Sequence, residues 1–203
     1  MTEPVLAVFG AGGFLLQMLP TLDRLRDAGR AIFIVDDRSL GLVFGYPVVR
    51  LDAVPSNAAF VVAVSDGRTR RQIVERLGGC RFWRATASSA LISPYAEIGE
   101  GAIICDYTIV EASCRIGRHF QGNIHSYVAH ECVIGDYVTF APRVSCNGNV
   151  QIGDHVTIGT GALLRQGTPK RPLIIGAGAI IQMGAVVTRD VEPSAVIKAN
   201  MRH

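Results

Sequence analysis

Charge of one sign, long apolar runs and paired cysteines are all scarce in this chain. Only 18% of the 203 residues are charged, and 20 basic residues are interleaved with 17 acidic ones, for a net charge of +3. Nucleic acid is therefore not an expected partner. No apolar stretch approaches the ~20 residues of a membrane-spanning helix. Membrane insertion is not expected either.

The five cysteines are odd in number and include no C-x-x-C pair. This usage favours reduced thiols over a disulfide framework or a zinc site. The chain also begins without the basic segment of a signal peptide. We expect a cytoplasmic protein that holds no metal.

Glycine, by contrast, is abundant at 22 residues, and in the first half it punctuates a strand–helix alternation. Apolar runs at 5–9, 31–35 and 60–64 predict strands, and helical patterns follow at 15–29 and 69–77. Continuous apolar strands that alternate with helices indicate a parallel sheet. We expect residues 1–85 to form a small Rossmann-like α/β domain.

Ligands of such sheets bind beyond the carboxyl ends of the strands, where glycines admit a phosphate to a helix N-terminus. A dinucleotide fingerprint is not met, because Leu15 stands where a third glycine is required. We therefore predict a nucleotide or nucleotide-sugar site; a glycine turn that only begins a helix is the alternative. The residues expected there are Gly12, Gly13, Phe14, Asp36, Asp37, Ser65 and Arg70.

The second half repeats every six residues. Apolar residues recur at that interval from Ile98 to Leu164, with Gly122 as the one lapse. Ile-Gly pairs recur every 18 residues from Ile98 to Ile152. Three hexads make one triangular coil, so residues 86–203 are expected to form a parallel β-helix. The next Ile-Gly pair in this 18-residue series, at Ile175, comes five residues late. We expect an outward insert at 165–172.

Stacked coils make residues 18 apart vertical neighbours. Cys114, Cys132 and Cys146 then point inward as small apolar residues. His119 and His155 are predicted to be solvated turn residues. His125 and His130 share the spacing of two metal ligands in hexapeptide carbonic anhydrases, but Ser89 stands at the third ligand position, which disfavours a metal site.

His130 lies at an edge of the predicted prism, with Gly148 as its vertical neighbour. A histidine can take the proton of an attacking amine, and a glycine N–H can stabilise the oxyanion of a tetrahedral intermediate. Glu131 could orient the imidazole, or be a solvated turn acid. Lys198 and other cations near the C-terminus could meet the phosphates of a coenzyme.

An α/β half with a glycine turn followed by hexads resembles the two-domain sugar acetyltransferases of bacillosamine, perosamine and sialic-acid biosynthesis. The segments 128–135, 148–153 and 184–188 carry the resemblance. It implies a left-handed β-helix, a homotrimer, acetyl-CoA as co-substrate with no permanently bound cofactor, and His130 as general base with Glu131. It also implies that Thr139, Gly148, Thr160 and Gly184 line the acetyl-CoA groove. Phe14 stands where that family has a histidine.

We therefore predict an enzyme that moves an acetyl group from acetyl-CoA to the amine of a nucleotide-linked amino sugar. Its catalytic residues are predicted to be His130, Glu131 and Gly148. A sugar O-acetyltransferase with the same site, or a non-catalytic trimer that binds nucleotide sugars, remains as an alternative.

Overall fold

The computed structural model describes residues 5–36, 38 and 41–199. Its first part is a six-stranded sheet in the order β3-β4-β2-β1-β5-β6, parallel except for the β3–β4 pair. The strands are β1 (Leu6–Phe9), β2 (Ile32–Val35), β3 (Gly41–Val43), β4 (Tyr46–Val49), β5 (Ala59–Val62) and β6 (Arg81–Phe82). The helices are α1 (Gly13–Asp27), the 3-10 turn η1 (Leu51–Ala53) and α2 (Gly67–Arg76).

The three predicted strands and both predicted helices are confirmed, with shifts of a few residues at their ends. The antiparallel pair β3–β4 and the edge strand β6 were not expected. Pro47 lies in β4, and β6 has only two residues. Neither segment shows the continuous apolar run that marks the inner strands.

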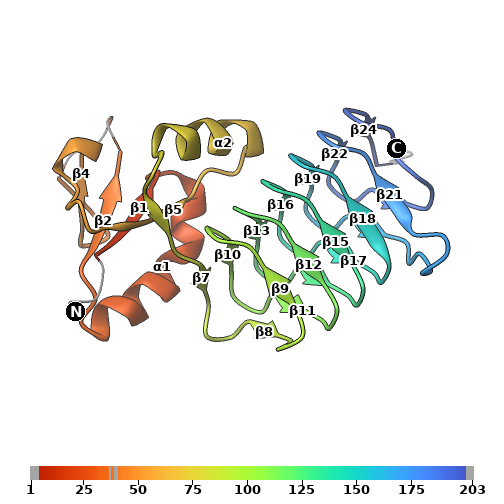
Figure 1. Ribbon diagram of the computed structural model, residues 1–203, viewed down its shortest axis with the longest axis horizontal. Coiled ribbons are helices and arrows are strands. Elements are labelled where there is room, and N and C mark those ends of the chain that lie inside the picture. Colours follow the sequence, from red (N-terminus) through yellow and green to blue (C-terminus); the bar gives the residue numbers. More distant parts are fainter. Residues whose placement is uncertain (1–4, 37, 39–40, 200–203) are drawn as a thin grey trace.

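The second part is a prism of three parallel sheets (Figure 1). The first, which we call sheet B, consists of β7 (Ala85–Thr86), β10 (Ile103–Ile104), β13 (Gln121–Gly122), β16 (Thr139–Phe140), β19 (Thr157–Ile158), β22 (Ile180–Ile181) and β24 (Val196–Ile197). Sheet C consists of β8 (Leu91–Ile92), β11 (Ile109–Val110), β14 (Tyr127–Val128), β17 (Ser145–Cys146), β20 (Leu163–Leu164) and β23 (Val186–Val187). Sheet D consists of β9 (Glu97–Ile98), β12 (Arg115–Ile116), β15 (Val133–Ile134), β18 (Val150–Ile152) and β21 (Leu173–Ile175).

The inward positions of these strands form one apolar core, as the repeat predicts. Cys114, Cys132 and Cys146 are among its buried members. The lapse at Gly122 has a packing reason: a Cβ at this glycine would meet the ring of Phe120, which is fully buried. The aromatic side chain fills the volume that a larger side chain at position 122 would otherwise take.

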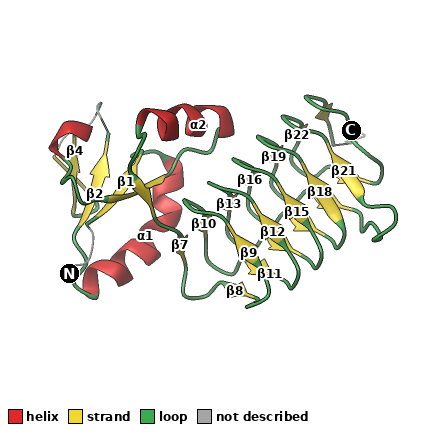
Figure 2. Ribbon diagram, in the orientation of Figure 1, coloured by secondary structure: helices red, strands yellow, loops and turns green. Residues whose placement is uncertain are grey.

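The α/β part rests against the outer face of sheet B, with α2 over the neighbouring coils (Figures 1 and 2). Ile103 and Cys105 on the early coils share a buried cluster with Leu15 and Met18 of α1. Gln121 donates from its side-chain amide to the carbonyl of Val62, at 2.8 Å. In the part of the chain that the structure describes, no helix has the length and apolar character needed to cross a membrane.

Candidate active site

His130 lies on the prism corner between sheets C and D, which we call the catalytic edge. Its side chain is 46% exposed, and its Nδ1 lies 3.1 Å from Oε2 of Glu131. In the tautomer with the proton on Nδ1, the imidazole donates a hydrogen bond to the Glu131 carboxylate. Nε2 is then unprotonated and can act as an acceptor. An imidazole in this state can receive a proton from a substrate.

Gly148 lies directly against the His130 ring, one coil further along the same edge. A Cβ at this position would overlap Cε1 and Nε2 of the ring, so only glycine leaves room for the imidazole as it stands. The Gly148 N–H makes no hydrogen bond to any of the described residues, whereas its carbonyl accepts one from the N–H of Gly167. The N–H of this glycine, which lies against the imidazole and makes no other hydrogen bond among the described residues, is available as an oxyanion donor.

Two further side chains hold the His130-Glu131 pair from the adjacent coils, and the sequence reasoning named neither. Glu111 accepts a hydrogen bond from the backbone N–H of His130, at 3.0 Å. Asn149 donates from its side-chain amide to Oε2 of Glu131, at 3.1 Å. The signal that could have found Asn149 is its spacing, since it stands 18 residues after Glu131 and is therefore its vertical neighbour.

An open hollow of about 540 Å³ lies beside His130 on the outer face of sheet C. Its lining is mostly apolar and includes Leu91, Ile109 and Val110, with the Glu111 side chain at its polar end. Further along the same face, Leu163 and Val186 are also exposed. This surface offers an acyl chain or another apolar group direct access to the histidine.

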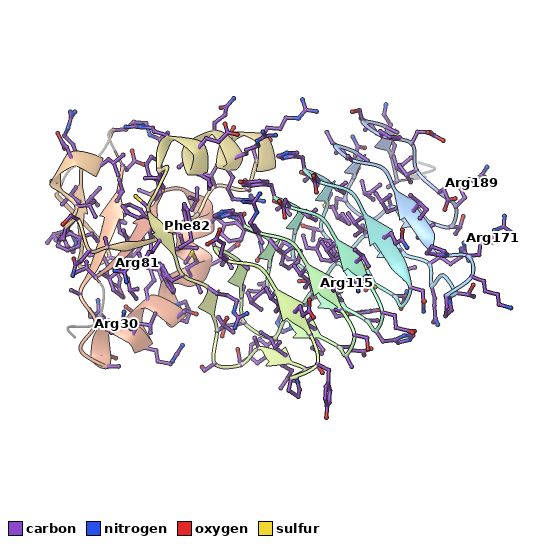
Figure 3. All side chains as sticks on the ribbon, in the orientation of Figure 1. Arg30, Arg81, Phe82, Arg115, Arg171 and Arg189 are labelled. Carbon is purple, nitrogen blue, oxygen red and sulfur yellow. The ribbon has the colours of Figure 1, made fainter. Side chains whose placement is uncertain are left out.

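The other residues predicted for acetyl-CoA lie further along the coils. Thr160 and Gly184 are adjacent, with the Gly184 N–H donating to the Thr160 carbonyl at 2.9 Å, but they lie on the corner between sheets B and C rather than on the catalytic edge. Lys198 is exposed after the last strand. Arg171 and Arg189 also lie at this end of the prism (Figure 3). The segment from Asn200 onward lies outside the described residues.

A second cavity, of about 380 Å³, opens at the carboxyl ends of β1, β2 and β5. Gly10, Asp36, Arg38, Thr69 and Arg76 are among its lining residues. The Asp36 carboxylate accepts hydrogen bonds from the Arg38 guanidinium and from the Ala11 N–H. The bond from Arg38 is the largest cause that lowers the pKa of Asp36 to about 2.

Several of the predicted nucleotide residues stand near this cavity. Gly12 and Gly13 are exposed at the start of α1, and a Cβ on either would meet open space. Ser65 is exposed just after β5. Asp37 lies outside the described residues.

The structure contradicts three of the predicted contacts. Phe14 is 8% exposed and packs in the core between α1 and the sheet, so its ring cannot stack on a nucleobase. Arg70 is fully buried, and its guanidinium donates to carbonyls of Val64, Ser65, His119 and Tyr137. It therefore joins the two halves of the chain instead of meeting a phosphate.

Thr139 is the third contradicted position, because it is buried in the same junction. Its hydroxyl donates to the Ser65 carbonyl at 2.7 Å and accepts from Arg70 at 3.0 Å. Burial lowers the pKa of Arg70 to about 9, which still leaves the guanidinium charged at neutral pH. The face of α2 that carries Arg70 points toward the β-helix. Neither the six-residue repeat nor the pattern of apolar strands predicts which face of this helix does so.

His119 was also predicted wrongly, since it is 1% exposed and not solvated. It lies on the corner between sheets D and B, which we call the docking edge because α2 packs against it. Its ring stacks on Tyr137 with centroids 5.2 Å apart, and Tyr137 stacks on His155 at the same spacing. Burial, followed by the nearby Arg70 charge, lowers the pKa of His119 to about 4.

No cluster of three or more His, Cys, Asp or Glu side chains that could hold a metal ion occurs among the residues described. His125 stacks on Tyr107 with centroids 4.9 Å apart. Ser89, at the third ligand position of the metal hypothesis, donates instead to Asp106 at 2.6 Å.

The left-handed prism with a carboxylate-held histidine and a free glycine N–H on one corner defines the class of hexapeptide acyltransferases. A scan against models of protein families finds none that matches the chain. Known proteins do match over most of its length. GDP-perosamine N-acetyltransferase from Escherichia coli O157:H7 is 41% identical over 182 residues, which cover 84% of this chain and 82% of that protein.

Solved structures also match this chain over nearly its whole length. WeeI from Acinetobacter baumannii AYE superposes with a TM-score of 0.91 at 40% identity and covers 98% of this chain and 99% of its own. PerB from Caulobacter crescentus, in complex with CoA and GDP-perosamine, has a TM-score of 0.84 at 27% identity, with 99% and 97% covered. The chain belongs to the hexapeptide-repeat sugar N-acetyltransferases, which use acetyl-CoA as the acetyl donor.

Proposed function

We propose that this enzyme acetylates the amino group of a GDP-linked amino sugar, with His130 as general base and the Gly148 N–H as oxyanion donor. The observation that carries the proposal is the geometry at the catalytic edge, where Nδ1 of His130 is held by Glu131 and Gly148 abuts Nε2. The E. coli relative is named for GDP-perosamine, which supports this class of acceptor.

The chemistry follows from these positions. The neutral amine attacks the thioester carbonyl of acetyl-CoA, and the oxygen of the tetrahedral intermediate accepts a hydrogen bond from the Gly148 N–H. Nε2 of His130 takes the proton that the nitrogen loses, while Glu131 stabilises the imidazolium through Nδ1–H. The C–S bond then breaks, and the imidazolium returns the proton to the departing CoA thiolate. No covalent enzyme intermediate is needed.

The two parts of the chain divide the substrates in this proposal. Residues 1–85 hold the nucleotide sugar in the cavity lined by Gly10, Asp36 and Thr69, with the open backbone of Gly12 and Gly13 toward the phosphates. Residues 86–203 hold acetyl-CoA along the prism, with Thr160, Gly184 and Lys198 near the adenosine end. An amine acceptor is favoured over a hydroxyl by the relative that is 41% identical, which is an N-acetyltransferase.

A homotrimer is part of the proposal. The outward column of sheet C is largely apolar and leaves His130 beside an open hollow, so a second wall from a neighbouring copy would complete the pocket. We further propose a cytoplasmic location, which the free thiols of all five cysteines support. Sedimentation equilibrium tests the assembly, and an active monomer would overturn it.

The test of the function is a thiol-release assay with acetyl-CoA against GDP-, UDP- and dTDP-linked amino sugars. We expect turnover with a GDP-linked amino sugar and a fall of ~10²–10⁴ in rate for His130→Ala. Its melting temperature and acetyl-CoA affinity should stay near those of the native enzyme, because the half-exposed side chain carries little packing. His125→Ala is the matched control, as an exposed histidine on another corner. Near-native turnover of His130→Ala would remove His130 from the mechanism.

A further inference from the structure

Asn149 is the least exposed polar side chain in contact with the catalytic pair. Asn149 as a whole residue is 7% exposed, and the side chains of His130 and Glu131 are each about half exposed. Its amide nitrogen lies 3.1 Å from Oε2 of Glu131. The same oxygen lies 3.1 Å from Nδ1 of His130. One carboxylate oxygen thus receives both the catalytic imidazole and the Asn149 amide.

The backbone holds Asn149 in place independently of this contact. Its N–H donates to the His130 carbonyl at 3.0 Å, and its own carbonyl accepts from the N–H of Leu173 at 3.1 Å. The residue has φ 58°, a left-handed conformation that asparagine tolerates better than most residues. The backbone therefore holds the Asn149 side chain in a fixed position, one coil away from Glu131.

Glu131, in contrast, needs an external restraint. It also occupies the left-handed region, with φ 59°, and its long side chain is half exposed. A free glutamate loses considerable rotamer entropy when it is held in a single orientation. A charge-assisted bond from an immobile amide offsets that loss and aims Oε2 at the imidazole.

We infer that Asn149 is a positioning residue for acetyl transfer, which acts by fixing the Glu131 carboxylate against Nδ1 of His130. The inference rests on the proposed role of His130 as general base. Asn149 touches neither the acetyl group nor the acceptor in this scheme. Its loss lowers the fraction of molecules in which the imidazole is correctly oriented, so it lowers kcat and leaves both KM values nearly unchanged.

The experiment is a double-mutant cycle between positions 149 and 131. Asn149→Gly deletes the amide and suits the left-handed backbone, so the change adds no strain. We expect kcat to fall roughly ten-fold, as for the loss of one hydrogen bond to a charged group, with less than about a two-fold change in either KM. In a Glu131→Gly background, the same substitution should change kcat by less than about two-fold, because its target is gone.

Two further variants keep the result interpretable. Asn149→Asp has the same shape and backbone preference but replaces the donor by a carboxylate that repels Glu131, so kcat should fall at least as far as in Asn149→Gly. Ser113→Gly is the matched control: it lies one coil on the other side of Glu131 with φ 61°, and among the described residues its side chain makes no hydrogen bond to the pair. This control should keep native kcat, and melting temperatures identify any unfolding.

Equal losses of kcat for Asn149→Gly in both backgrounds would overturn the inference, as would an unchanged kcat or an effect confined to KM. These outcomes are separate from failure of the proposed function. If His130→Ala retains turnover, the base itself is wrong. If His130→Ala is inactive while Asn149→Gly is fully active, only the positioning role fails.

Discussion

The interior of the β-helix and its junction with the α/β half are both buried, but they are built from different groups. The coil interior consists of aliphatic side chains, alanines, cysteines and two phenylalanines whose rings meet edge to face. The junction buries Arg70, His119, Gln121 and Thr139. The hydrophobic effect has no preferred direction, whereas hydrogen bonds fix both distance and direction. The junction therefore fixes how the cavity at the carboxyl ends of β1, β2 and β5 faces the prism, and the coil interior makes the prism rigid.

Removing the buried cation should have the largest effect on stability. Arg70→Met leaves several carbonyls of both halves without their donor, and we expect the free energy of unfolding to fall by about 4 kcal/mol. Ile134→Val, which deletes one methylene from the coil interior, should cost about 1 kcal/mol. Urea unfolding measures both.

Arg71→Met is the control for this comparison, since Arg71 lies on the same helix but is exposed and forms a surface salt bridge with Glu75. It should change stability by less than about 0.5 kcal/mol. Similar losses for the Arg70 and Arg71 variants would mean that the junction contributes no more than an ordinary surface.

The buried histidine gives the junction a pH dependence that the coil interior lacks. His119 has a pKa lowered to about 4 in the folded chain, against ~6.5 when unfolded. Between these values the unfolded chain binds the proton and the folded one does not, so stability falls as the pH falls from about 6.5 to 4. The loss attributable to His119 should reach about 3 kcal/mol at pH 4.

His119→Phe should flatten this part of the stability profile, because a phenyl ring can occupy the place between Phe82 and Tyr137 without titrating. His125→Phe changes an exposed histidine and should leave the slope as it is. Denaturant unfolding from pH 4 to 7 makes the comparison. Parallel profiles for native enzyme and His119→Phe would show that His119 is protonated without penalty.

The last prediction concerns the turn before α1, where we expect a change in ligand binding and none in stability. Gly13→Val adds a side chain that meets no protein atom, so the melting temperature should hold. If the glycine backbone faces a nucleotide phosphate, the added bulk should weaken GDP binding by roughly ten-fold, or about 1.4 kcal/mol. Isothermal titration calorimetry measures it. Unchanged affinity would mean that this turn serves only to begin the helix.

The degree to which sequence predicts structure also differs between these regions. In the coils, spacing alone placed Gly148 against His130, because an 18-residue period makes vertical neighbours certain. The same arithmetic would have placed Asn149 beside Glu131. The period says nothing about what packs on the outside, which is why His119 was taken as solvated.

The α/β half has no repeat that would predict which residues are neighbours. The strands and helices were predictable from apolar runs. Phe14 was assigned to a ligand because the resembled family has a histidine at that place, and Arg70 because it lies shortly after a strand end. A helix near a binding edge presents several faces, and tertiary packing decides which of them meets the ligand. The hydrogen bonds from Arg70 to carbonyls 49 and 67 residues away have no local signal.

The left-handed corner residues restrict how this enzyme can change over evolutionary time. Residues from Tyr107 to His155 adopt positive φ every sixth position. Deleting one residue between Glu131 and Tyr137 would bring the β-branched Val138 to a corner, where positive φ is strongly disfavoured. Substitution is thus open along the coils, while changes of length are confined to whole coils or to corner loops. The loop 165–172 is such an addition, and its Gly167 N–H bonds to the Gly148 carbonyl. The insertion therefore adjoins Gly148 and His130, the proposed general base, so changes in this loop can alter the surroundings of His130 without disturbing the register of the prism.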